Sequence, residues 1–169
     1  MSAETIIALW RDTRAGLIAE VELIPEDQFP FKATPETRSI TELLQHVVQS
    51  QKFLVGEVCR ADTNLMRQSF AAHLKEYAVG VTDVTDKNGL IALLKSSMDD
   101  AENSIRSFAD QLDETMTRFD GKPSSKAGFL TFAFSHEMYH RGQLTVYERL
   151  LRIEPALTGK LKKVFAEAG

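Results

Sequence analysis

Apolar residues recur at steps of three and four along most of the chain, with charged residues between them. This spacing is that of helices with one buried face. It predicts four long helices, over about 3–23, from 39 to 58, around 91–112 and over about 125–151. No stretch alternates apolar and polar residues over a useful length, and no internal repeat is present. The pattern therefore predicts an all-α fold, a four-helix bundle in one domain of residues 1–169.

Proline and capping residues indicate where these helices begin and end. Pro25, Pro30 and Pro35 interrupt the first repeat, so residues 25–38 are expected to form a long connection. Ser39-Ile40-Thr41-Glu42 has the form of a capping box and predicts the start of the second helix. Two short extra helices are predicted. One covers residues 65–77, capped by Asp62 or Thr63, and the other lies within 157–165.

Composition narrows the classes of function. The chain has 169 residues, 43% hydrophobic and 26% charged, which is typical of a soluble globular protein. A net charge of −4 gives no basic surface for nucleic acid. Cys59 is the single cysteine, which excludes an internal disulfide and favours a reducing compartment. Neither a signal peptide nor a membrane span is recognised, so we expect a cytoplasmic protein with a small-molecule partner.

The last long helix contains the most informative sequence, Ser135-His136-Glu137-Met138-Tyr139-His140-Arg141-Gly142-Gln143. Its expected inward positions include His136, His140 and Gln143. Residues four apart lie on one face of a helix, so both imidazoles can face one metal ion. The full inward set is Phe129, Ala133, His136, His140, Gln143, Tyr147 and Leu150.

The first half of the same helix is apolar on several faces. Leu130 and Phe134 lie off the side that carries the histidines. A helix that is apolar on several sides is buried on several sides. The pattern predicts cover from the loops or a subunit interface, and we expect a homodimer.

Three metal chemistries are compatible with these residues. His136-Glu137-Met138-Tyr139-His140 matches the H-E-x-x-H pattern of zinc peptidases, although no strands are predicted to hold an extended peptide. Glu137 and His140 also form an E-x-x-H element of di-iron bundles, but the required second copy is missing. The third possibility uses His46, which lies on the flank of the apolar stripe of the second helix.

A histidine in the second helix, followed by H-x-x-x-H and Arg-Gly-Gln in the last core helix, resembles the DinB/YfiT-like family of metalloenzymes. The resemblance covers nearly the whole chain. It implies a four-helix bundle in which His46, His136 and His140 bind one divalent metal, nickel, zinc or iron. It further implies an enzyme of the hydrolase or transferase type, in which the metal activates a low-molecular-weight thiol for attack on a small electrophile. The alternative is a non-catalytic bundle, with a structural metal or none, that serves as an interaction or stress-response protein.

The remaining polar residues have less specific interpretations. Glu137 is a candidate general base, or a carboxylate near the ligands or at the surface. Gln143 is a candidate for orienting a ligand or a bound water. His73, flanked by Lys75 and Glu76, is expected to be solvated.

Overall fold

The computed structural model describes residues 1–167. Four long helices form its core, and two short helices, three 3-10 turns and one small hairpin connect or extend them. The long helices are α1 (Ala3–Leu23), α2 (Ile40–Val58), α4 (Lys87–Ser107) and α5 (Lys126–Leu150). The other elements are η1 (Glu26–Gln28), α3 (Phe70–Tyr77), η2 (Val81–Asp83), η3 (Ala109–Gln111), β1 (Thr115–Thr117), β2 (Pro123–Ser125) and α6 (Ala156–Glu167).

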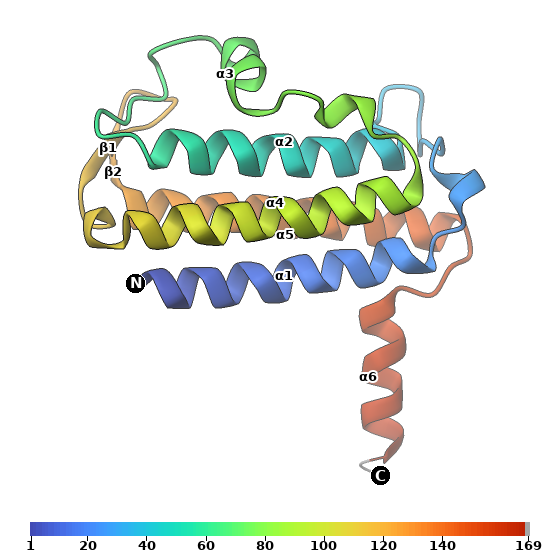
Figure 1. The fold of residues 1–169 in the computed structure, drawn as a ribbon. Coiled ribbons are helices and arrows are strands. Elements are labelled where there is room, and N and C mark those ends of the chain that lie inside the picture. The colour runs from blue at the N-terminus through green and yellow to red at the C-terminus, as the bar shows by residue number, and fades with distance from the viewer. Residues whose placement is uncertain (168–169) are drawn as a thin grey trace.

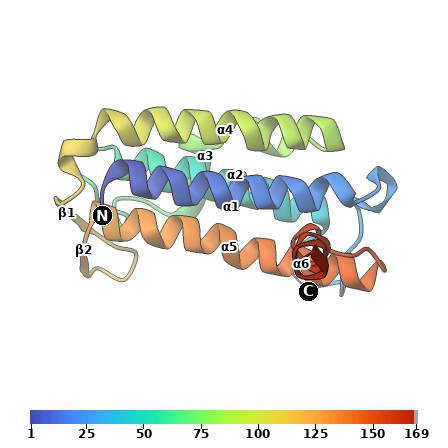
Figure 2. The same cartoon turned by 90° about the horizontal axis from the view of Figure 1, so that it is seen from below.

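The four long helices form a bundle in which α1 and α2 each pack against both α4 and α5. In Figures 1 and 2, α1 and α5 run in one direction, while α2 and α4 run in the other. Residues 59–86 join the parallel helices α2 and α4, so this connection returns along the length of the bundle. Residues 24–39 join the antiparallel helices α1 and α2, which lie diagonally across the bundle from each other. The segment that contains α3 lies along the outer side of α2, and α6 projects away from the bundle (Figure 1).

The helix boundaries follow local signals in the sequence. The predicted first helix is confirmed at Ala3–Leu23, where the side chain of Ser2 accepts a hydrogen bond from the amide of Thr5. The capping box of the second helix is also confirmed. Ser39 Oγ accepts from the amide of Glu42, and the Glu42 carboxylate accepts from the amide of Ser39. Ser125 caps α5 in a similar way.

Two local predictions were wrong. The short helix begins at Phe70, with Ser69 as its cap, because the chain before it is held in a parallel bridge between Asn64 and Thr117. Residues 115–125 form an antiparallel hairpin of two three-residue strands, too short to show alternation in the sequence. For Leu130, the sequence left open cover from the loops or from a partner subunit. Residues of its own chain bury it completely, so its burial needs no partner subunit.

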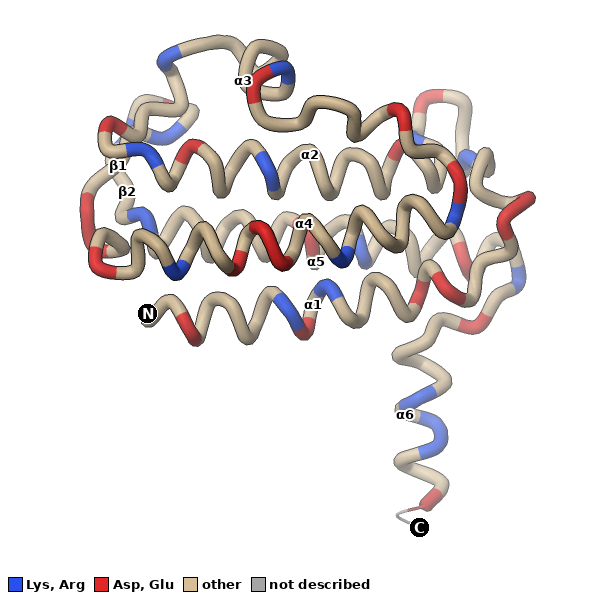
Figure 3. Tube along the Cα trace, viewed as in Figure 1, with Lys and Arg blue, Asp and Glu red and all other residues tan. Residues whose placement is uncertain are grey.

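The apolar interior consists of two clusters, one in each half of the bundle. Trp10, Phe53 and Leu130 belong to the first cluster, and Leu17, Leu44 and Leu144 belong to the second. A buried polar layer lies between them, at the middle of all four long helices. It is made up of Arg14, Gln51, Ser97 and Glu137. Figure 3 shows few charged positions along α2 and many in the loops at the ends of the bundle.

Candidate metal centre

Three imidazoles from two helices converge beside the buried polar layer. His46 comes from α2, and His136 and His140 come from consecutive turns of α5. The centre of the His46 ring lies 5.3 Å from that of His136 and 4.7 Å from that of His140, and the centres of the latter two rings are 4.3 Å apart. One nitrogen of each ring lies within 4.8 Å of the others. The structure thus brings together all three histidines that the sequence singles out.

The orientation of His140 is fixed by Gln143, one turn further along α5. Gln143 Oε1 lies 2.8 Å from His140 Nδ1. Because an amide oxygen only accepts hydrogen bonds, the Nδ1 atom carries the proton and Nε2 is left with a lone pair. That Nε2 atom lies 3.0 Å from His136 Nε2. Gln143 therefore orients a ring nitrogen toward the shared centre, as second-layer residues do in metal sites.

The surroundings keep these imidazoles neutral. Burial, followed by the nearby Arg38 guanidinium and the other two rings, lowers the pKa of His46 to about 3. Burial, His140 and Arg38 lower the pKa of His136 to about 4. The pKa of His140 is also lowered, chiefly by burial. Only neutral imidazole has a free lone pair for a metal, so the site holds its donors in the ligating form.

The donor set fits a divalent transition-metal ion. Three nitrogen ligands leave coordination positions open, which distinguishes catalytic from closed structural sites. Imidazole suits zinc, nickel, iron and copper, so the identity of the ion does not follow from the ligands. His46 and His136 are half-buried and line a cavity of about 170 Å³, which gives a small molecule access to the rings.

Glu137 is not placed to act on a molecule at this centre. It is buried in the bundle interior, and its carboxylate is engaged by residues of α1. Arg14 Nε donates to Glu137 Oε1 over 2.5 Å, and Arg14 Nη2 donates to Oε2 over 2.8 Å. Trp10 Nε1 donates to the same Oε2 atom over 2.6 Å. A carboxylate engaged in this way does not serve as the general base of a peptidase, and the three-residue strands offer little edge for a peptide.

His73 belongs to a second polar group, and the prediction that it is solvated was wrong. Its side chain is 1% exposed, because Phe53 of α2 packs against the ring. His73 Nε2 lies 3.2 Å from the carbonyl oxygen of Leu65, and Nδ1 lies 3.3 Å from Glu57. Other elements cover the ring, so the charge of Lys75 and Glu76 was a poor guide to its exposure.

Glu57, His73 and Glu76 are also close enough together to be considered as metal ligands. In this group, however, an arginine side chain supplies the positive charge that a metal ion would otherwise provide. The Arg67 guanidinium forms ion pairs with both carboxylates, and Tyr77 donates a hydrogen bond of 2.8 Å to Glu57. This network fastens the segment around α3 to α2, beside the histidine site.

The fold is that of a helical bundle, and its three clustered histidines could hold a metal ion. The chain belongs to the DinB superfamily, whose sequence profile matches residues 5–144. No curated protein sequence matches it. The family resemblance predicted from the histidine pattern is therefore confirmed, together with the helical-bundle fold.

Solved structures with the same fold include three informative examples. The DinB-like protein YjoA of Bacillus subtilis is 22% identical, with a TM-score of 0.67 over 87% of this chain and 91% of its own. YfiT of the same organism, a probable metal-dependent hydrolase with an unusual four-helix bundle topology, is 16% identical, with a TM-score of 0.69 over 90% and 89%. A mycothiol-dependent maleylpyruvate isomerase is 17% identical, with a TM-score of 0.66, and the match covers 85% of this chain and 61% of that one.

Sequence reasoning missed several residues around the histidines. Phe70, Phe119 and Phe132 form the apolar wall of the cavity at His46, and they come from α3, the hairpin turn and α5. Arg38 lies in the loop before α2. Phe132 lies four residues before His136 on the same face of α5, so the helical period could have indicated it. The other three residues come from the connections between the long helices, and no period relates them to the site.

Proposed function

We propose that this protein is a metal-dependent enzyme that acts on a small molecule, with His46, His136 and His140 as the ligands of one divalent cation. The main support is the convergence of three neutral imidazoles from two helices beside an accessible cavity. Three polarisable donors, with no carboxylate in the same group among residues 1–167, form a site for a cation with open positions. When bound, such an ion would supply Lewis acidity and lower the pKa of a water or thiol at the site.

The chain's own residues contribute positioning and exclusion of water. Gln143 holds the ring of His140 through its Nδ1 proton. Phe70, Phe119 and Phe132 provide an apolar surface against which a substrate can be held away from bulk water. Glu137 and Arg14 stabilise the turn of α5 that carries both of its histidines.

A low-molecular-weight thiol is the co-substrate that we propose. The support is the shared fold with a mycothiol-dependent isomerase and the lack of a reactive thiol at the site. Cys59 is half-buried, and burial raises the pKa of its thiol to about 12, so it stays protonated at neutral pH. Transfer of a thiol group would therefore use an external thiol.

Metal analysis of the purified protein tests the first part of this proposal. We expect one divalent ion per chain, and loss of that ion in a His136→Ala/His140→Ala variant that keeps its helical circular dichroism. A variant that unfolds would instead support a structural metal in a non-catalytic bundle. Wild-type protein that binds no nickel, zinc or iron would refute the proposal.

Thiol-transfer assays test the second part. Metal-loaded protein would be mixed with 1-chloro-2,4-dinitrobenzene and, in turn, glutathione, cysteine and mycothiol. Turnover that requires both the metal and one of these thiols supports a thiol-dependent transferase. A Cys59→Ala variant should retain that turnover, because the Cys59 thiol takes no part.

A further inference from the structure

Two cavities of different character meet at His46. The first, of about 170 Å³, is lined mainly by aromatic and other apolar side chains, among them Phe119 and Phe132. The second, of about 430 Å³, is polar and lies under the loop that precedes α2. His46 and Phe70 line both cavities. A molecule at the imidazoles therefore has an apolar surface on one side and a polar, charged surface on the other.

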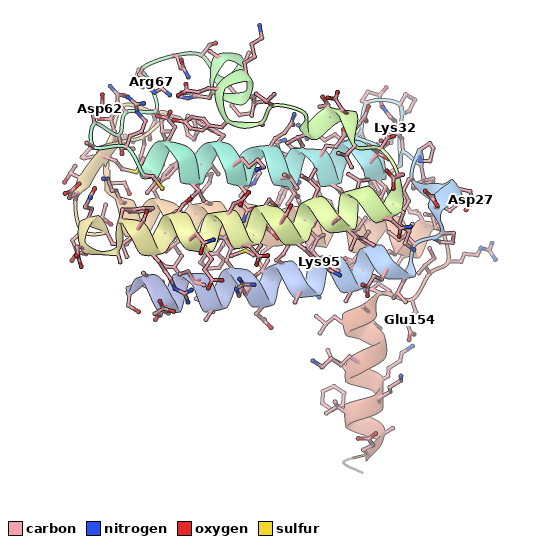
Figure 4. The ribbon with its side chains drawn as sticks, in the orientation of Figure 1. Asp27, Lys32, Asp62, Arg67, Lys95 and Glu154 are labelled. Carbon is pink, nitrogen blue, oxygen red and sulfur yellow. The ribbon has the colours of Figure 1, made fainter. Side chains whose placement is uncertain are left out.

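Arg38 is the basic residue of the polar cavity that lacks an ion-pair partner among residues 1–167. Lys32, labelled in Figure 4, also lines this cavity, but its ammonium group lies 3.0 Å from the Glu42 carboxylate. The Arg38 guanidinium is close enough to influence all three imidazoles electrostatically. Its positive charge thus acts on the histidine site, and no carboxylate of residues 1–167 forms an ion pair with it.

The backbone at Arg38 is held by both helices that carry the histidines. Tyr147 of α5 donates a hydrogen bond of 2.9 Å to the carbonyl oxygen of Arg38. The next residue, Ser39, is the N-cap of α2. Phe31 packs edge-on against the Tyr147 ring and fixes it further. The backbone that carries Arg38 is therefore fixed beside the polar cavity, although its side chain is exposed.

We infer that Arg38 binds the anionic group of the ligand and that this ligand is a small carboxylate with an apolar or aromatic substituent. A guanidinium matches the planar, two-oxygen geometry of a carboxylate. Glu36 and Glu42 line the same cavity, so a singly charged anion suits it better than a doubly charged phosphate. The apolar substituent would lie against Phe119 and Phe132. This inference rests on the proposed function, because it assigns the substrate class of the same site.

Calorimetric titration of zinc-loaded protein with phenylacetate tests the inference. We expect wild-type protein to bind phenylacetate more tightly than it binds acetate or the neutral phenylacetamide. Arg38→Met should weaken phenylacetate binding by about tenfold or more, because it removes a charged hydrogen bond. It should leave phenylacetamide binding unchanged. Phe132→Ala should weaken phenylacetate but not acetate.

Lys95→Met is the matched control, because it removes one positive charge from the exposed face of α4 (Figure 4). It should leave phenylacetate binding within about twofold of wild type, since an exposed charge at a distance is screened by salt. Equal weakening by Arg38→Met and Lys95→Met would show an effect of net charge alone and would overturn the inference. Failure of wild-type protein to bind phenylacetate would overturn it as well, and so would tighter binding of phenyl phosphate.

Zinc stoichiometry measured in the same samples separates this inference from the proposed function. Arg38→Met should bind zinc at least as tightly as wild type, because a neighbouring positive charge has been removed. If phenylacetate binding requires zinc but does not depend on Arg38, the carboxylate binds at the metal. That result would refute the role of Arg38 and leave the metal centre standing. Absence of zinc from wild-type protein would refute the proposed function itself.

Discussion

The buried pair of Arg14 and Glu137 permits a sharp test of how the bundle is held together. Both side chains are about 2% exposed, at the level where the two apolar clusters meet. Each long helix supplies a partner in this layer. In addition to Glu137, the Arg14 guanidinium donates to Gln51 Oε1 over 2.8 Å and to Ser97 Oγ over 2.9 Å. We predict that Glu137→Leu strongly destabilises the fold, because it leaves this guanidinium buried without a counter-charge.

The size of the expected loss of stability in Glu137→Leu follows from the burial of the ion pair. Removal of one partner from a buried ion pair costs about 3–5 kcal/mol. For a chain of this length, that corresponds to a fall in Tm of roughly 6–20 °C. The double variant Arg14→Met/Glu137→Leu should be more stable than Glu137→Leu, because neither charge then remains alone in the interior.

Urea denaturation followed by circular dichroism, with metal-free protein, measures this effect. The control is Glu4→Leu, which removes one partner of the exposed Arg106–Glu4 pair and should leave the midpoint nearly unchanged. A Glu137→Leu midpoint equal to that of wild type would refute the reasoning. The single variant Arg14→Met completes the cycle. If the double variant loses as much free energy of unfolding as Arg14→Met and Glu137→Leu lose together, the two side chains are not coupled.

Three further predictions address other parts of the chain. Burial and the nearby Glu20 carboxylate raise the pKa of Glu148 to about 8, so the stability contributed by this carboxyl group should be lost as pH rises from about 4.5 to 8, by on the order of 5 kcal/mol. The difference in free energy of unfolding between wild type and Glu148→Gln should therefore shift against wild type between pH 5 and pH 8, and an unchanged difference would contradict the assignment. Gln143→Leu should weaken metal binding by about tenfold or more in competition with a chelating dye, because the ring of His140 loses its fixed orientation. Unchanged affinity would show that packing alone orients this ring. The homodimer stays a prediction, now without the support of Leu130, and light scattering at micromolar concentration should give twice the mass of one chain.

Helix positions and the histidine pair could be predicted because both depend on local spacing. The cap at Ser39, the breaks at Pro25 and Pro30, and the four-residue step from His136 to His140 involve residues close together in the sequence. Backbone geometry turns such spacings into structure in almost any surroundings. The family resemblance added His46, whose place on the flank of α2 left its direction open.

The exposure of single polar residues could not be predicted from their neighbours. His73 and Glu137 each lie beside charged or polar residues in the sequence, and both are buried. Phe53 covers the first, and Arg14 neutralises the second, from helices far away along the chain. The hairpin was missed for a similar reason, because its short strands are held partly through the bridge from Asn64 to Thr117.

The sequence by itself determined the helices, their caps, the two neighbouring imidazoles and the membership of the DinB superfamily. Only the tertiary structure decided which side of α5 faces the other helices and which face of the site is charged. It oriented Glu137 toward Arg14, covered Leu130 with the chain's own residues and placed Arg38 near the imidazoles. The physical reason is that periodicity defines a helix face, whereas burial and charge pairing depend on segments that the chain brings together only when the whole bundle packs.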